Sequence, residues 1–283
     1  MGRPRERAAP GLIGAALMAL VQAPAALPAF HPVEGAIYRS DTRETRTEDG
    51  VPQHFHASRR IVFRREATGY VAETTIESAD QSGPQAGSAF LAGNRAFIGH
   101  VVRVHLDATG AITAVDDADA LIERLAASIE AAARTVAGPA RAAAMAAPLR
   151  AFDPAQRRTM LGSAVADLIR LVDVTRPDGT RTVALPSRVP MAVGQALPGT
   201  ETVRRDGDAV SITTHAAGPV AVGGAMVPGA ATGTVTLDTL RRVDTATALV
   251  IESRSTRVIT TASGAHSSRA ETVTTLVRAS KTP

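Results

Sequence analysis

Two histidines, His54 and His56, have the spacing of metal ligands that share one face of a strand. Residues two apart on an extended chain point the same way, so both imidazoles could reach one ion. A zinc site needs at least a third protein ligand, and no nearby His, Asp or Glu has a motif spacing. The pattern therefore favours an exposed face shared with Arg60 and Arg64, and leaves His54 and His56 as a candidate metal pair only.

The serines and histidines that could form a hydrolase site are poorly spaced. Ser211 and His215 share a strand face, but four residues along an extended strand separate them too far for a hydrogen bond. Ser163 lies inside a helical pattern and lacks the G-x-S-x-G turn that exposes a nucleophile. His100 and His105 fall on opposite faces of a continuous strand. The sequence therefore predicts no catalytic residue, and an exported hydrolase is the third of three functional hypotheses.

Cofactor and nucleic-acid sites are equally unsupported. Gly223 and Gly224 have no Lys-Ser/Thr sequel and no G-x-G-x-x-G before a helix, so a phosphate loop is not predicted. The net charge is only +4, and the densest arginine cluster is interleaved with Asp41, Glu44 and Glu66. Such a mixture indicates a solvated sheet face rather than a polyanion groove. Aromatic residues make up only 3%, which supplies few rings for stacking on sugars or bases. No cofactor and no nucleic-acid partner is expected.

The amino terminus has the order of a secretory signal peptide. Arg3, Arg5 and Arg7 precede an apolar run over residues 11–21, and small residues and prolines follow up to residue 29. The run is too short for a helix to span ~30 Å of hydrocarbon. We predict a signal peptide over residues 1–29, cut after Ala25 or Ala29, and a periplasmic or secreted protein; an uncleaved anchor is the alternative. Without cysteine the chain cannot be a lipoprotein.

The remainder, residues 30–283, is predicted to be a single β-rich domain with strands at 36–115 and 173–280. Residues 53–65 alternate between apolar and polar side chains, the period of a half-buried antiparallel strand. The last two strands, about 248–261 and 265–280, are long and polar on both faces, which strand ends extending beyond the core would explain. The uncharged, glycine-containing segment 219–233 predicts a flexible apolar loop.

A helical insertion at 117–172 interrupts the strands. Leu121, Leu125 and Ile129 belong to a helical stripe over 117–136, which Asp116 or Asp117 would cap and Gly138 would end. A second helix begins at Asp153, a cap residue followed by proline, and its stripe includes Leu161 and Leu168. These two helices should pack on the sheet.

Strands, a central helical insertion and long returning strands, with turns such as 107–110, resemble the open half-barrels of bacterial lipoprotein carriers and related exported proteins of unknown function. The resemblance implies helices over a concave sheet with an apolar cavity between them. We therefore predict a mainly β (α+β) fold, a curved antiparallel sheet or open half-barrel with two central helices packed on it. The expected ligand cavity is lined by Leu121, Leu125, Ile129, Leu161 and Leu168.

Three functions follow from these patterns. The first is a non-enzymatic cell-envelope protein that binds a lipid or another hydrophobic molecule between sheet and helices. The alternative is a structural or protein-interaction module of the periplasm that pairs through its long polar strands. The hydrolase is third, because no nucleophile or metal constellation supports it.

Overall fold

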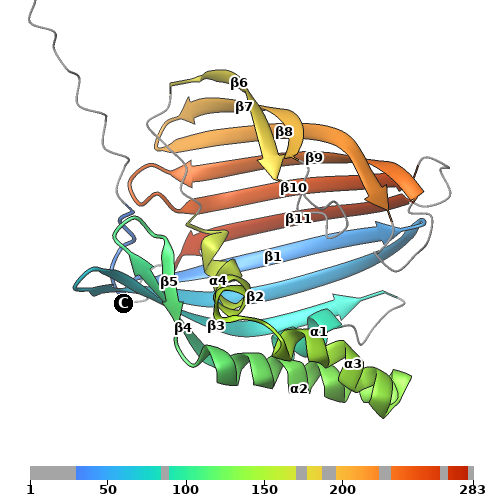
Figure 1. The fold of residues 1–283 in the computed structure, drawn as a ribbon. Coiled ribbons are helices and arrows are strands. Elements are labelled where there is room, and N and C mark those ends of the chain that lie inside the picture. The colour runs from blue at the N-terminus through green and yellow to red at the C-terminus, as the bar shows by residue number, and fades with distance from the viewer. Residues whose placement is uncertain are drawn as a thin grey trace, which may run out of the picture.

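The computed structural model describes residues 30–83, 89–169, 177–186, 196–222, 231–261 and 267–279. In these parts eleven strands form one open antiparallel sheet that curves visibly in Figure 1. The curved antiparallel sheet with helices packed on it, predicted from the strand and helix patterns, is confirmed. The predicted signal peptide at 1–29 lies outside the described residues.

Two meanders of antiparallel strands meet at the centre of the sheet. The first runs to one edge and comprises β1 (Ile37–Glu48), β2 (Val51–Glu66), β3 (Gly69–Ser82), β4 (Val101–Asp107) and β5 (Ile112–Val115). The second runs inwards from the other edge and comprises β6 (Gly179–Pro186), β7 (Ala196–Asp206), β8 (Ala209–Val222), β9 (Ala231–Asp244), β10 (Val250–Thr261) and β11 (Ser267–Arg278). They join where β1 pairs with β11, so the first and last strands are neighbours at the centre.

The predicted apolar loop at 219–233 was wrong at both ends. Residues 219–222 belong to β8 and 231–233 to β9, and Val222 pairs with Ala231. The valines and the threonine in these stretches suit a pleated strand, and that preference outweighs the glycine content. Residues 223–230 lie outside the described part of the chain.

Four helices occur in the described residues rather than the two expected: α1 (Ala89–Arg95), α2 (Ala118–Ala137), α3 (Pro139–Arg150) and α4 (Pro154–Ala166). Helix α1 interrupts the block predicted as strands only. Helix α3 buries just Ala142 and Ala146, so its sequence has no stripe of large apolar residues to reveal it. None of the helices within the described ranges is long and apolar enough to cross a membrane.

The helix ends follow local chemistry, with one exception. Asp153 caps α4 as predicted: its side chain accepts from the Gln156 amide at 2.8 Å, and the Gln156 side chain accepts from the Asp153 amide. Gly138, with φ +77°, ends α2 as predicted. Asp117 instead adopts a left-handed conformation and makes no side-chain cap, so the predicted carboxylate cap of α2 was wrong. Asp116 accepts a hydrogen bond from His105 instead.

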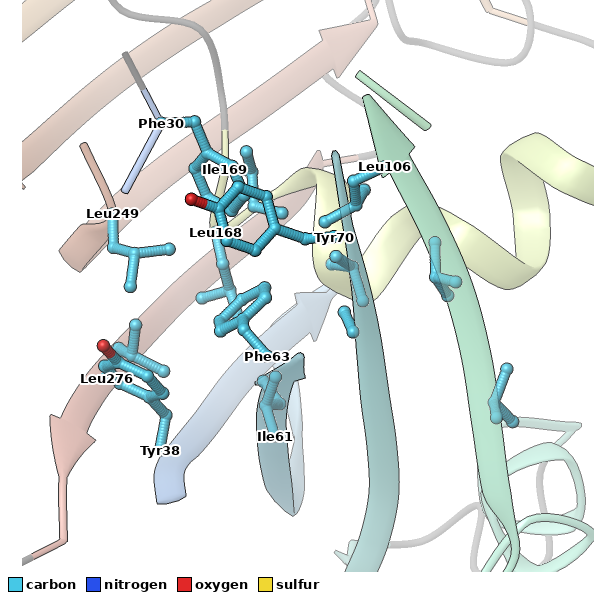
Figure 2. Close-up of a cluster of buried hydrophobic side chains, with 14 residues drawn as sticks. Phe30, Tyr38, Ile61, Phe63, Tyr70, Leu106, Leu168, Ile169, Leu249 and Leu276 are labelled. Atoms are coloured by element: carbon cyan, nitrogen blue, oxygen red, sulfur yellow. The ribbon is translucent and has the colours of Figure 1, made fainter. Parts of the chain in front are cut away.

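The main core lies between α4 and the strands β1 to β4. Phe30 packs edge-on against Phe63 and Tyr70, with ring centroids 5.7 and 5.2 Å apart, and Leu168 and Ile169 follow directly after α4 (Figure 2). In Figure 1 the helices are drawn over the β1–β5 side, and no helix lies in front of β7 to β10. The concave face therefore has a helix-covered part and a part that these helices leave open.

Candidate functional site

A continuous row of polar residues crosses the part of the sheet that the helices leave open. Strand register places one residue from each strand directly opposite the next. We call this set the polar row: Arg181 (β6), Glu201 (β7), Thr214 (β8), Thr239 (β9), Ser255 (β10), Thr272 (β11) and Glu44 (β1). At ~4.8 Å per strand the row extends for about 29 Å across the sheet.

The polar row faces the concave side, the same side as the core. Thr214 lies between the buried Ile212 and Ala216 on β8, and Glu44 lies opposite the buried Phe55 on β2. Since side chains alternate along a strand and opposite residues share a face, all members of the row point to this side. Thr214 is only 3% exposed and Thr239 only 7%. Buried hydroxyls at mid-strand need hydrogen-bond partners.

Only part of the row is satisfied by neighbouring side chains. Arg181 Nε donates to Glu201 Oε1 at 2.9 Å, and Arg46 Nε donates to Glu44 Oε1 at 2.5 Å. In contrast, the Thr239 hydroxyl is buried and has no hydrogen-bond partner in the part of the chain that the structure describes. An unsatisfied buried hydroxyl destabilises the folded protein by about 1–3 kcal/mol. Such a group needs an explanation, and a bound ligand that forms a hydrogen bond with it is one.

An apolar row runs parallel to the polar row on the same face. Leu185 lies opposite Leu197, Gly218 opposite Val235, and Val235 opposite Ile259. Leu197 and Val235 are buried, whereas Leu185 and Ile259 are partly exposed and pack against them. We call Leu185, Leu197, Gly218, Val235 and Ile259 the apolar row. A second apolar cluster lies on the other side of the polar row, formed by Val203, Val210, Ile212, Val243 and Val250.

The predicted cavity residues do not form one set. Leu168 is 2% exposed within the main core, and Leu121 packs against that core from α2. Leu125 is buried and lies close to Gly93 of α1, and Ile129 and Leu161 are half-buried. The space beside Leu168 is thus filled by side chains, and the cavity itself stays a prediction.

The histidine pair has separate partners. His54 Nδ1 lies 3.1 Å from Thr45 Oγ1, while His56 Nε2 lies 2.7 Å from Asp41 Oδ2. Both point to the convex face, as the alternation of β2 predicts. Within the described ranges, no group of three or more His, Asp or Glu side chains could hold a metal ion.

Other histidines also pair with carboxylates on the convex face. His105 lies between Asp116 and Glu66, at 2.8 and 3.1 Å, and hydrogen bonding to Asp116 raises the pKa of its imidazole. His215 Nδ1 lies 2.6 Å from Asp238. These pairs are solvated and lie on the face opposite the polar row, so they tie strands together rather than build a site.

No protein-family model matches this chain, and a search of the curated proteins gives no match. The function must therefore be argued from the two rows.

Sequence reasoning missed the rows because it explained the polar strands differently. Ser253 and Ser255 were expected to belong to strand ends beyond the core, yet they lie at mid-strand opposite Thr274 and Thr272. Alternation of Ser253 and Ser255 with Arg254 was a signal for one hydroxyl-bearing face. The row across strands was not readable, because it depends on the register between segments far apart in the chain.

Proposed function

We propose that this chain is an exported, non-enzymatic protein that binds an amphipathic small molecule on the concave face of β6 to β11. The carrying observation is that an apolar row and a polar row lie side by side on that face. A molecule with a hydrocarbon part and a polar end is the class of ligand that both rows suit at once. The site differs from the helix-covered one expected from the sequence, but the hydrophobic ligand class is the same.

Glycine at position 218 supports the placement of the hydrocarbon part. In a strand interior, glycine weakens the sheet and often marks a place where another group approaches closely. A Cβ at Gly218 would lie 3.0 Å from Leu197 Cδ2, inside the apolar row. The Leu197 side chain therefore packs directly against the Gly218 backbone, and a larger side chain at 218 would displace it within the apolar row.

The test is binding of an uncharged fluorescent hydrophobic probe, such as the methyl ester of cis-parinaric acid. Gly218→Val should weaken binding of the ester by about tenfold or more, because the new side chain fills the apolar row. Ala217→Val is the matched control, since Ala217 is its chain neighbour on the exposed opposite face. Absence of ester binding by the unmodified protein, or equal loss in both variants, would refute the proposal.

Export rests on the order of charged, apolar and small residues in 1–29. Amino-terminal sequencing of protein recovered from the periplasm or medium should start at Ala26 or Phe30. Recovery of the chain with Met1 in the membrane fraction would favour the uncleaved anchor.

The sheet order favours one second candidate, a protein-interaction module. Strand β6 pairs with β7 on one side and ends the sheet of described strands on the other. Unpaired strand edges can add a strand from a partner. Light scattering during size-exclusion chromatography would show a concentration-dependent dimer if a second copy pairs there.

A further inference from the structure

Arg257 lies on the concave face between the two rows. Its neighbours across the strands are Leu237 on β9 and Ala270 on β11, both on the side of the buried Ala216. Arg257 itself is half-buried. No hydrogen bond or ion pair joins its guanidinium to a residue that the structure describes, in contrast to Arg181 and Arg46. A partly desolvated guanidinium without a partner is a candidate anion site.

Three hydroxyl-bearing residues of the polar row lie next to Arg257. Ser255 precedes it by two residues on the same face of β10, and Thr239 and Thr272 are its diagonal neighbours on β9 and β11. Diagonal neighbours are about 7–8 Å apart at Cα, within reach of a long side chain. The buried hydroxyl of Thr239, which has no partner among the described residues, is a second and independent observation that favours a polar ligand group here.

The charge of this part of the face favours an anion. The polar row and the neighbouring row through Arg257 carry three arginines, Arg46, Arg181 and Arg257, against two acids, Glu44 and Glu201. Arg46 and Arg181 pair with these acids, so the guanidinium of Arg257 is in excess. In a half-buried setting such an excess attracts a negative group more strongly than it would in bulk water.

The apolar part of the site has the length of a long hydrocarbon chain. The apolar row extends from Leu185 on β6 to Ile259 on β10, and the buried Ala216 of the same cluster lies between it and the polar row. Four strand spacings give it a length of about 19 Å. Ile259 follows Arg257 by two residues on the same face, so one end of the row lies next to the guanidinium.

We infer that the ligand is a long-chain fatty acid, with its carboxylate held by Arg257 and the hydroxyls of Ser255, Thr239 and Thr272. Its hydrocarbon chain lies along the apolar row. The inference rests on the proposed function and adds the head group and its anchor. A guanidinium fork and adjacent hydroxyl donors match the two oxygens of a carboxylate.

The experiment compares cis-parinaric acid with its methyl ester on the full chain and three variants. The unmodified protein should bind the acid more tightly than the ester. Arg257→Gln should weaken binding of the acid by about tenfold to a hundredfold, the range expected for charge-assisted hydrogen bonds, and leave ester binding unchanged. Arg257→Lys, which keeps the charge but loses the fork, should be intermediate. Arg254→Gln is the matched control, because Arg254 lies on the convex face of the same strand, beside Glu252.

The outcomes separate the two proposals. If neither probe binds, the proposed function fails. If both bind and Arg257→Gln has no more effect on the acid than Arg254→Gln, only the head-group inference fails. Competition identifies the anion: palmitate should displace parinaric acid better than lysophosphatidylglycerol, which offers a phosphodiester on one acyl chain. The opposite order would overturn the carboxylate assignment.

Discussion

Arg59 and Arg257 show how one face of the sheet can use the same side chain in two ways. Arg59 lies beneath the helices, where its Nη2 donates to Asn94 Oδ1 of α1 at 3.4 Å. Burial lowers the pKa of Arg59, and the nearby charge of Asp167 opposes that shift. Arg59 thus connects the sheet to the helices, although its sequence context suggested a solvated face. Arg257 lies where no helix brings it a comparable partner.

His105 should make stability depend on pH. Hydrogen bonding to Asp116, and then to Glu66, raises the pKa of His105 above 6.5, so the folded state favours the protonated ring. Its stabilising effect is therefore complete below the ordinary pKa and is lost as pH rises through the raised value. We expect His105→Gln to destabilise the protein at pH 6, by about 1 kcal/mol or less for a pair this exposed, and to have no such effect at pH 9.

Urea unfolding of both proteins at the two pH values measures this difference. A loss of stability that is the same at pH 6 and pH 9 would show that protonation of His105 does not matter.

Gly110 should be irreplaceable in the turn between β4 and β5. It has φ +88°, and an added Cβ would lie 2.4 Å from Ile169 Cγ2 and 3.1 Å from Phe30 Cγ. Gly50 has φ +83° but open space around it, so it is a matched control. Thermal or urea unfolding should show a loss of about 1–2 kcal/mol for Gly50→Ala from the backbone conformation alone. Gly110→Ala adds overpacking of about 1–3 kcal/mol. Equal losses would mean that the core yields freely around Gly110.

Helix α4 positions the apolar residues that close the main core, so its cap should matter. Asp153→Ala removes the reciprocal hydrogen bonds with Gln156 and should cost about 1 kcal/mol in urea unfolding. Asp153→Asn keeps an acceptor and should lose only a small part of that. If Asp153→Ala is neutral, packing of Val165, Leu168 and Ile169 alone fixes the helix.

The elements that the sequence predicted well are those whose signal is local. Helix α2 has an apolar stripe, and Gly138 and Asp153 mark helix ends that the structure confirms, whereas Leu168 of the stripe predicted for the second helix lies beyond the end of α4. Helix α3 was not predicted, because its buried residues, Ala142 and Ala146, do not form a recognisable apolar stripe within an alanine-rich segment. The polar row could not be predicted, because its residues become neighbours only through six strand pairings. Pairing between distant segments cannot be read from any one segment of the sequence.

The concave face has a helix-covered part and an open part, and a substitution of Leu168 tests which of them binds the ligand. Leu168 belongs to the helix-covered core, whereas Leu197 and Val235 of the apolar row form a separate cluster. Leu168→Ala should therefore cost about 2–5 kcal/mol, as large-to-small changes in a packed core do. Binding of parinaric acid should be unchanged at temperatures where the variant is folded. A small stability loss combined with weaker binding would instead place the ligand beneath the helices, as the sequence had suggested.

The pairing of β1 with β11 makes completion of the sheet's centre depend on two segments far apart in the chain. Thr42 and Thr274, whose hydroxyls are 3.1 Å apart, are separated by 232 positions. Closing so long a loop is slow, and until then β1 exposes an unpaired edge that can aggregate. A chain truncated after residue 261 should therefore aggregate in proportion to its concentration, whereas a chain that includes β11 refolds in dilute solution.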